Sequence, residues 1–266
     1  MASRTAQLRR GWSTGKKIWG SGYQKSGGIT LYHPREAWYE ENAAEMLRLL
    51  HETQALLTEG LGIQPPDEVT CLVTDPEWAG DVFGVAGLAL EDFILVACPP
   101  RCLSEFAGTA AHELAHLLAR SLGPSETPFK CEGFACYAAE VIDADVRPFG
   151  IPLHHHLVWM LSVGLRPTLA ELWRRSDHTP ELYDLAWSFA TFVVETYGLA
   201  RYSQLYGATD QPLDARIRES LGLSPAKLEH AWFGAASASV NKSPAALSRM
   251  RRGAGSACSR AAWLAG

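Results

Sequence analysis

Two histidines and a glutamate are grouped in residues 110–118, which read AAHELAHLL. Residues four apart on a helix lie on one face, so His112 and His116 can present their imidazoles to one divalent ion at about 2.0–2.1 Å. Glu113 projects about 100° away around the helix, too far to be an easy third ligand of the same ion. It is placed to take a proton from a water molecule beside that ion. The stretch therefore predicts a metal ion and a carboxylate base that act together.

This spacing, His-Glu-x-x-His, is typical of zinc metalloproteases. The alternative is an amphipathic helix with two hydrogen-bonded histidines and a surface glutamate. The alanines and leucines around the motif make the helix largely apolar and predict that it is buried. Buried histidines and a buried glutamate need polar partners, and a metal ion supplies them. The flanking residues therefore favour the metal site.

A catalytic zinc site needs a third protein ligand and one open position. After His116 the chain reaches Glu132-Gly133-Phe134-Ala135. With this motif the chain resembles the gluzincins, the thermolysin-like and M1-like zinc metallopeptidases, and most of all their small peptidase MA-like domains. The resemblance implies that His112 and His116 bind zinc, one ion per chain, that Glu113 is the general base, and that Glu132, opening the next helix, is the third ligand. The alternative for Glu132 is a favourable charge at a helix N-terminus.

The resemblance further implies hydrolysis of a peptide bond by a zinc-activated water. The tetrahedral oxyanion then needs a second stabilising group, which a downstream Tyr or His supplies in gluzincins. Tyr183 falls where these families place a tyrosine before a helix. We therefore predict that Tyr183 is catalytic, with Tyr137 and His178 as rivals and a core or interface tyrosine as the alternative.

In gluzincins a substrate peptide also pairs with the sheet edge beside the zinc helix. Residues 82–88 resemble that strand, and Gly84, Val85, Ala86 and Gly87 are the predicted substrate-binding residues. Their glycines permit close backbone approach, and an added strand binds through main-chain hydrogen bonds. The alternative is an ordinary buried strand.

His154, His155 and His156 form a second polar cluster. Consecutive residues diverge by about 100° on a helix, so the three cannot chelate one ion without an irregular backbone. We expect a surface or groove-lining run, and one member could still reach the substrate.

These residues need a sheet and helices to position them. Hydrophobic periodicity and turn signals predict an α+β fold, and the resemblance to gluzincins implies that this fold is of the zincin type. In it, a small twisted sheet with an N-terminal helix packs on a mainly helical C-terminal half, and the active-site helix lies between them. The predicted strands are 29–32, 69–74, 82–90 and 93–97, with a hairpin turn at 91–92. The predicted helices are 35–61, 104–121 with Ser104 as its cap, 132–143, 151–165, 168–175, 180–197 and 225–236.

Charge divides the 266 residues into three parts. Residues 1–35 contain seven Lys and Arg residues and no Asp or Glu, and residues 240–266 contain five Lys and Arg residues and no Asp or Glu. The middle of the chain contains the other 12 Lys and Arg residues and all 29 Asp and Glu residues. We predict a flexible basic arm at 1–28, a catalytic domain at 29–239 and a disordered basic tail at 240–266. The domain comprises a sheet-containing part, 29–122, and a helical part, 123–239.

An acidic body disfavours nucleic acid as a partner. We find no run of about 18 apolar residues and no secretory signal, which predicts no membrane partner and a cytoplasmic location, with organellar targeting by the basic N-terminus left open. The six cysteines are then expected to be free thiols. Three hypotheses follow: a zinc peptidase acting on peptides or proteins, a catalytically inactive gluzincin-like zinc module that binds proteins, and a metal-free helical interaction protein. The sequence does not predict the oligomeric state.

Overall fold

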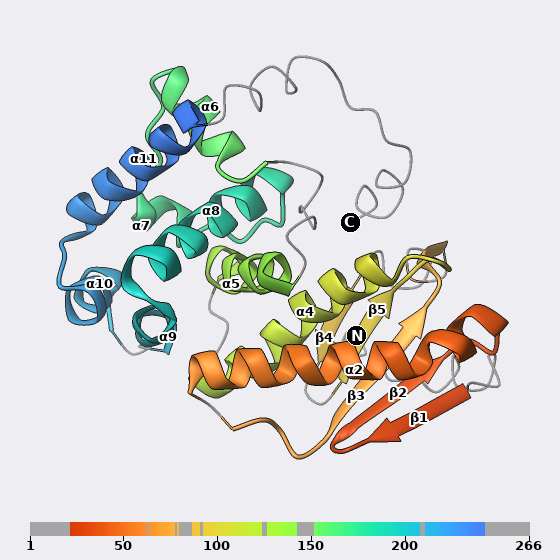
Figure 1. Cartoon of the computed structure of the whole chain (residues 1–266). Coiled ribbons are helices and arrows are strands. Elements are labelled where there is room, and N and C mark those ends of the chain that lie inside the picture. Colours follow the sequence, from red (N-terminus) through yellow and green to blue (C-terminus); the bar gives the residue numbers. More distant parts are fainter. Residues whose placement is uncertain are drawn as a thin grey trace, which may run out of the picture.

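The computed structural model describes residues 22–62, 64–77, 79, 87–90, 93–123, 127–142, 152–207 and 211–242. The chain has an α+β fold, as the sequence predicts, with a five-stranded mixed sheet beside a helical half (Figure 1). The strands are β1 (Gly22–Ser26), β2 (Ile29–His33), β3 (Val69–Thr74), β4 (Gly87–Leu90) and β5 (Phe93–Ala97). The sheet order is β1-β2-β3-β5-β4; β2, β3 and β5 are parallel, and β1 and β4 are antiparallel edge strands.

Helices make up the rest of the described fold. They are α2 (Ala37–Leu61), α4 (Leu103–Ala119), the 3-10 helix η1 (Arg120–Leu122), α5 (Pro128–Ile142), α6 (His155–Ser162), α7 (Leu169–Leu172), α8 (Pro180–Tyr197), α9 (Leu199–Gly207), α10 (Leu213–Leu221) and α11 (Pro225–Lys242). Among the described residues, none of these helices combines the length and apolarity needed to cross a bilayer.

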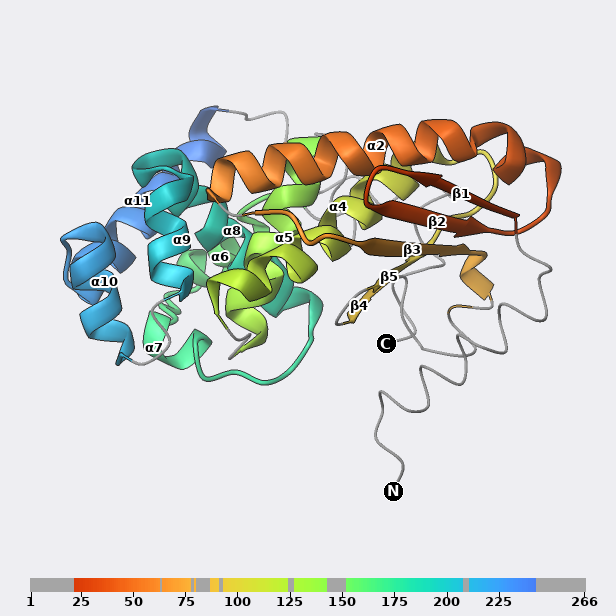
Figure 2. The ribbon, with the colours of Figure 1, turned by 90° about the horizontal axis from the view of Figure 1, so that it is seen from below.

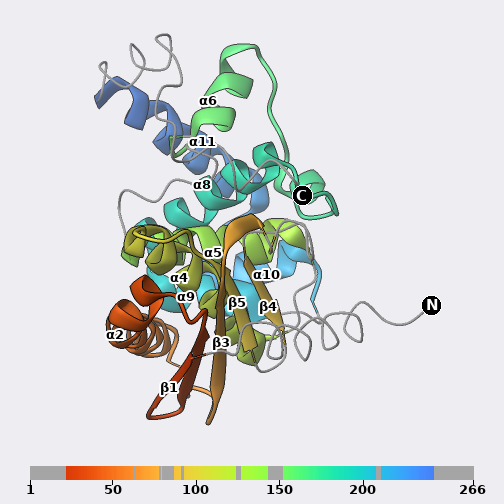
Figure 3. The same cartoon turned by 90° about the vertical axis from the view of Figure 1, so that its right-hand side faces the viewer.

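The two faces of the sheet differ in what covers them. Side chains alternate between faces along a strand, and those of Leu31, Cys71 and Ile94 join the main core beneath α2 and α4. Leu72 and Leu95 point to the opposite face and form a smaller apolar cluster there. Figures 2 and 3 show α2 and α4 lying along the same side of the sheet. The active-site helix predicted from the sequence is thus anchored against the sheet on one side.

On its other side, α4 packs against α5, which in turn packs against α8. Gly133 makes the second contact possible, because a Cβ at this position would lie 2.5 Å from the backbone oxygen of Ala186. The close approach brings residues of α8 next to the face of α5 that points to α4. α5 therefore packs between α4 and α8, although α6 and α7 lie between α5 and α8 in the sequence.

The prediction of a loose arm through residue 28 is wrong for its last part. Residues 22–26 form β1, which pairs with β2 from Ser26↔Ile29 to Gly22↔His33. Gly27 has φ +52°, so Gly27-Gly28 is the two-residue turn of a hairpin rather than a flexible stretch. Residues 1–21 lie outside the described residues.

Several predicted helix boundaries also need correction. α4 begins at Leu103, so Ser104 lies inside the helix and is not its cap. α5 begins at Pro128, one turn before Glu132. α6 begins only at His155, because His154 has φ +67° and breaks a continuous helix from 151. α11 continues to Lys242, past the predicted start of the tail at 240, and residues 243–266 lie outside the described part.

Candidate metal centre

α4 holds the two histidines of the motif on one face. His112 and His116 are one turn apart, their ring centroids are 4.8 Å apart, and their Nε2 atoms are 3.1 Å apart. The helix is buried almost throughout from Phe106 to Ala119, with His116 among its less buried members. The i, i+4 spacing in the sequence therefore becomes a pair of imidazole nitrogens that face a common point.

Glu132 reaches the same point from α5. Its Oε2 atom lies 3.1 Å from Nε2 of His112 and 3.2 Å from Nε2 of His116. It is the fifth residue of α5 and is only 6% exposed, so it does not open the helix as the family resemblance implies. The positive end of a helix dipole stabilises a carboxylate only in the first turn. Because Glu132 lies beyond the first turn of α5, this effect does not explain the presence of a glutamate there.

The three donor atoms fit a zinc ion. Their separations of 3.1, 3.1 and 3.2 Å define a triangle with a circumscribed radius of about 1.8 Å, so a point about 2.0–2.1 Å from all three exists. The separations are also close to the edge of a zinc tetrahedron, about 3.3 Å for such bond lengths. The side chain of His116 is 17% exposed, which leaves this side of the cluster accessible. His112, His116 and Glu132 are thus a candidate metal-ligating group.

Glu132 and His116 stabilise each other's charged forms. Burial alone would raise the pKa of Glu132, but His116 and His112 outweigh burial and hold that pKa well below its usual range. Burial would likewise lower the pKa of His116, yet the Glu132 carboxylate raises it. A carboxylate kept ionised inside the protein needs positive charge beside it, and a metal ion supplies such charge.

Glu113 lies beside the cluster and against β4. It is 6% exposed, and burial raises the pKa of its carboxyl group. A Cβ on Gly87 would lie 2.9 Å from both Cγ and Cδ of Glu113 and closer still to Oε1. The edge strand and the candidate base are therefore in direct contact. Of the predicted substrate-binding residues, Gly84, Val85 and Ala86 lie outside the described residues.

Tyr183 lies in the first turns of α8, next to both elements of the cluster. Its ring stacks over that of His112 with centroids 6.4 Å apart and an interplanar angle of 13°. Burial raises the pKa of its hydroxyl, and the nearby Glu132 carboxylate, to which it is hydrogen-bonded, raises it further. α8 begins here because Thr179 caps the backbone N–H of Leu182 and Pro180 occupies the first position.

The two rivals of Tyr183 lie in different places. His178 is also near the cluster, with Nδ1 3.8 Å from Oε1 of Glu132, but its side chain is 60% exposed. Tyr137 lies elsewhere on α5, where burial and then the carboxylates of Glu195 and Glu140 raise its pKa. The structure therefore brings Tyr183 and His178, and not Tyr137, to the candidate centre.

Two of the three consecutive histidines, His154 and His156, connect the start of α6 to α8. His154 Nδ1 lies 2.6 Å from the Ser188 hydroxyl, which also accepts a hydrogen bond from a tryptophan on α11. Asp184 Oδ2 accepts a hydrogen bond from the backbone N–H of His156 and lies 3.3 Å from its Nδ1. None of these contacts involves the metal cluster, so they give this run a role in packing.

Arg120 is a neighbour of the centre that the sequence reasoning missed. It continues the four-residue spacing of His112 and His116, and its Nη2 donates a hydrogen bond to the Ala89 carbonyl of β4 at 2.9 Å. The four-residue spacing in the sequence indicates that Arg120 lies on the same helix face as the two histidines.

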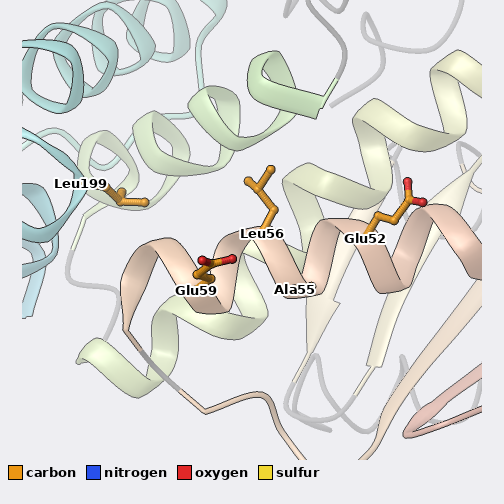
Figure 4. A pocket seen from close by; sticks show the side chains of 5 residues that line it. All are labelled: Glu52, Ala55, Leu56, Glu59 and Leu199. Atoms are coloured by element: carbon orange, nitrogen blue, oxygen red, sulfur yellow. The ribbon is translucent and has the colours of Figure 1, made fainter.

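A pocket elsewhere on the surface is separate from the centre. Figure 4 shows it between α2 and the start of α9, with Leu56 projecting from α2. It is lined by Glu52, Ala55, Leu56, Glu59 and Leu199. None of these residues belongs to the histidine and glutamate cluster.

No protein-family model matches the chain, and no curated protein matches its sequence. Among solved structures it is similar to the M1 zinc metallopeptidase of Deinococcus radiodurans. A variant of that enzyme bound to a Tyr-Ser-Ala substrate shows 16% identity over 80% of this chain and 51% of that chain, with a TM-score of 0.44. The same variant without that substrate gives 15% identity, the same coverage and a TM-score of 0.42. The unmodified enzyme shows 16% identity over 80% of this chain and 50% of that chain, with a TM-score of 0.41. The chain thus spans about half the length of these distantly similar structures.

Proposed function

We propose that this protein is a zinc-dependent metallopeptidase that hydrolyses peptide bonds. The observation that carries the proposal is the convergence of three donor atoms from His112, His116 and Glu132, with separations of 3.1–3.2 Å, beside the buried carboxyl group of Glu113. Two imidazoles and one carboxylate are a donor set of catalytic zinc sites, in which the fourth position stays open.

The three ligands would hold one zinc ion per chain. Bound there, zinc supplies a Lewis acid that activates water and polarises the substrate carbonyl. Glu132 contributes the negative charge of the site, since its pKa is held low by the two histidines against the effect of burial. His112 and His116 would each contribute an imidazole nitrogen, and their helix fixes the spacing of these two donors.

Glu113 would be the general base. Its place one residue after His112 puts it beside the ligands without joining them, where it would accept a proton from the attacking water and pass it to the leaving amine. Burial raises the pKa of this carboxyl group, which helps it to retain the proton between the two transfers. Its contact with Gly87 supports a proton transfer at the edge of the sheet.

Tyr183 would stabilise the developing oxyanion. Burial and the Glu132 carboxylate raise the pKa of its hydroxyl, so the group stays protonated near neutral pH and can donate a hydrogen bond. Its bond to Glu132 keeps that donor next to the reacting centre. Engagement of Glu132 as a ligand would leave the hydroxyl available to substrate.

The substrate would bind along β4. This strand is an edge of the sheet, and one of its residues touches the proposed base. A peptide added to its free side gains main-chain hydrogen bonds irrespective of sequence. Gly87, together with the preceding residues Gly84, Val85 and Ala86, would form this binding strand.

Metal analysis combined with a peptide-library digest tests the proposal. Wild type and Glu113→Gln should each bind one zinc per chain, and only the wild type should cleave peptides, in a manner abolished by chelation. Glu132→Ala should lose both zinc and cleavage. Stoichiometric zinc without cleavage would support the inactive, protein-binding module instead, and full activity of Glu113→Gln would contradict the proposed mechanism.

A further inference from the structure

Arg120 lies in line with the metal cluster. His112, His116 and Arg120 are spaced by four residues, so the arginine follows His116 by one turn, about 6 Å along the helix direction. It is exposed, and its positive charge acts on His116. A cation thus lies one helical turn beyond the candidate centre.

The same arginine contacts the strand proposed to bind substrate. Its Nη2 donates to the Ala89 carbonyl at 2.9 Å. Backbone groups along a strand alternate with a period of two, so Gly87 and Ala89 present their N–H and C=O groups on the same edge. β5 occupies the other edge of β4. Gly87 touches Glu113 and Ala89 binds Arg120, so α4 and β4 run side by side from the proposed base to the guanidinium.

Arg120 also closes the strand edge at this point. A peptide that pairs with Gly87 and continues toward Ala89 meets a carbonyl that already accepts a hydrogen bond. One turn of helix corresponds to about two residues of an extended peptide. A peptide group located about two residues from the cleaved bond would therefore lie against the guanidinium.

The arginine has donors left for such a group. A guanidinium carries five N–H donors, and the hydrogen bond to Ala89 uses Nη2. Within the described parts of the chain, no carboxylate forms an ion pair with Arg120. The planar donor set matches a carboxylate, which it can bind through two parallel hydrogen bonds.

We propose that Arg120 forms a carboxylate-binding subsite, which selects peptides with a carboxylate within about two residues of the cleaved bond. The inference rests on the proposed peptidase function and names the substrate class. The carboxylate comes either from an Asp or Glu side chain or from the C-terminus of the peptide. Arg120 is then a specificity-determining residue that contacts substrate and leaves zinc binding to the cluster.

The test starts from a peptide that the wild type cleaves in a synthetic library. Asp or Glu is compared with Asn or Gln at the two positions on each side of the cleaved bond. A free C-terminus is compared with a C-terminal amide, which separates the two sources of carboxylate. Each pair is measured with wild type, Arg120→Gln, Arg120→Lys and the matched control Arg218→Gln, which alters another exposed arginine near the end of a helix, α10.

We expect wild type and Arg218→Gln to favour one carboxylate form by about tenfold to hundredfold in kcat/KM, mainly through KM. Arg120→Gln should reduce the preference below about threefold, and Arg120→Lys should restore part of it. Cleavage without a carboxylate preference, or a preference that survives in Arg120→Gln, would overturn the inference.

A binding measurement separates this inference from the peptidase proposal. Fluorescence anisotropy with labelled acid and amide peptides is carried out on Glu113→Gln, with and without Arg120→Gln. Tighter binding of the acid form that requires Arg120 supports the subsite even if the wild type cleaves no peptide, a result that would contradict the peptidase proposal alone. Equal binding of the two forms would overturn the subsite.

Discussion

Gly87 on the edge strand lies against the carboxyl group of Glu113 on α4, so closely that a Cβ at position 87 would lie 2.9 Å from Cδ. The contact joins the proposed substrate strand to the proposed base. A methyl group at position 87 would force the Glu113 side chain to shift, and the position of that carboxylate matters for the proposed proton transfer.

Gly87→Ala should therefore displace the Glu113 carboxylate and lower kcat by about tenfold to hundredfold, because misplacement of a catalytic group by about 1 Å has effects of this size. Zinc content should stay at one per chain, since His112, His116 and Glu132 are untouched. The control is Gly234→Ala, where an added Cβ meets nothing within 4 Å. Equal kcat values for Gly87→Ala and wild type would show that the contact is irrelevant to activity.

Removal of the metal should destabilise the protein. A ligand that binds only the folded state stabilises it by an amount that grows with the logarithm of its concentration. Chelation should therefore lower the thermal midpoint of the wild type, and zinc should restore it. In Glu132→Ala neither treatment should shift the midpoint, as measured by circular dichroism. A zinc response that persists in this variant would place the metal at other residues.

Tyr183→Phe should retain zinc and lower kcat by about a hundredfold, since removal of one oxyanion donor has effects of about 10²–10³. Steady-state kinetics with a cleavable peptide measures the loss. Tyr137→Phe is the matched control, because Tyr137 lies near Glu195 and Glu140 rather than at the cluster. If His178→Gln were the variant with the large loss and Tyr183→Phe retained full activity, the oxyanion role would move to His178.

His154 should make stability depend on pH. Burial lowers its pKa from 6.5, so the folded state holds this histidine neutral while the unfolded chain binds the proton more readily. Stability from this source is present above about pH 6.5 and decreases as the pH falls toward the lowered value. His154→Asn should flatten the fall of the urea midpoint between pH 7 and 5, and Asn suits the positive φ. An unchanged slope would contradict the assignment.

Gly133→Ala should destabilise the fold by about 1–3 kcal/mol, as overpacking of a tight interior contact does. The added Cβ would lie 2.5 Å from the Ala186 backbone oxygen and force α5 and α8 apart. Urea denaturation measures the change, and a loss of zinc affinity should accompany it, because Glu132 neighbours this contact. Wild-type stability together with wild-type zinc affinity would show that the helices accommodate the methyl group without cost.

The predictability of each element depended on how local its signal was. The strand 69–74 matches β3, because a β-branched run specifies an extended backbone, and 180–197 matches α8. β1 was missed because Gly27-Gly28 suggests looseness as well as a hairpin turn, and only pairing with β2 decides between them. The early start of α5 has a local signal in the sequence: Thr127 caps the N–H of Lys130 and Pro128 takes the first position.

In the candidate site too, some features follow from local sequence and others only from tertiary packing. The spacing of His112 and His116 follows from the helix alone, and the structure brings their nitrogens together as that spacing predicts. The convergence of Glu132 depends on how α5 packs between α4 and α8, which no local pattern encodes. The contacts of Gly87 and Arg120 with α4 and β4 likewise arise only when strand and helix are packed side by side.

Anomalous scattering from a crystal of the zinc-loaded wild type, recorded on both sides of the zinc absorption edge, would locate the metal ion. We expect a single strong zinc peak about 2.0–2.1 Å from Nε2 of His112, Nε2 of His116 and a carboxylate oxygen of Glu132, with solvent at the fourth position. A zinc ion bound elsewhere, or a fourth protein donor in place of solvent, would contradict the proposed zinc site.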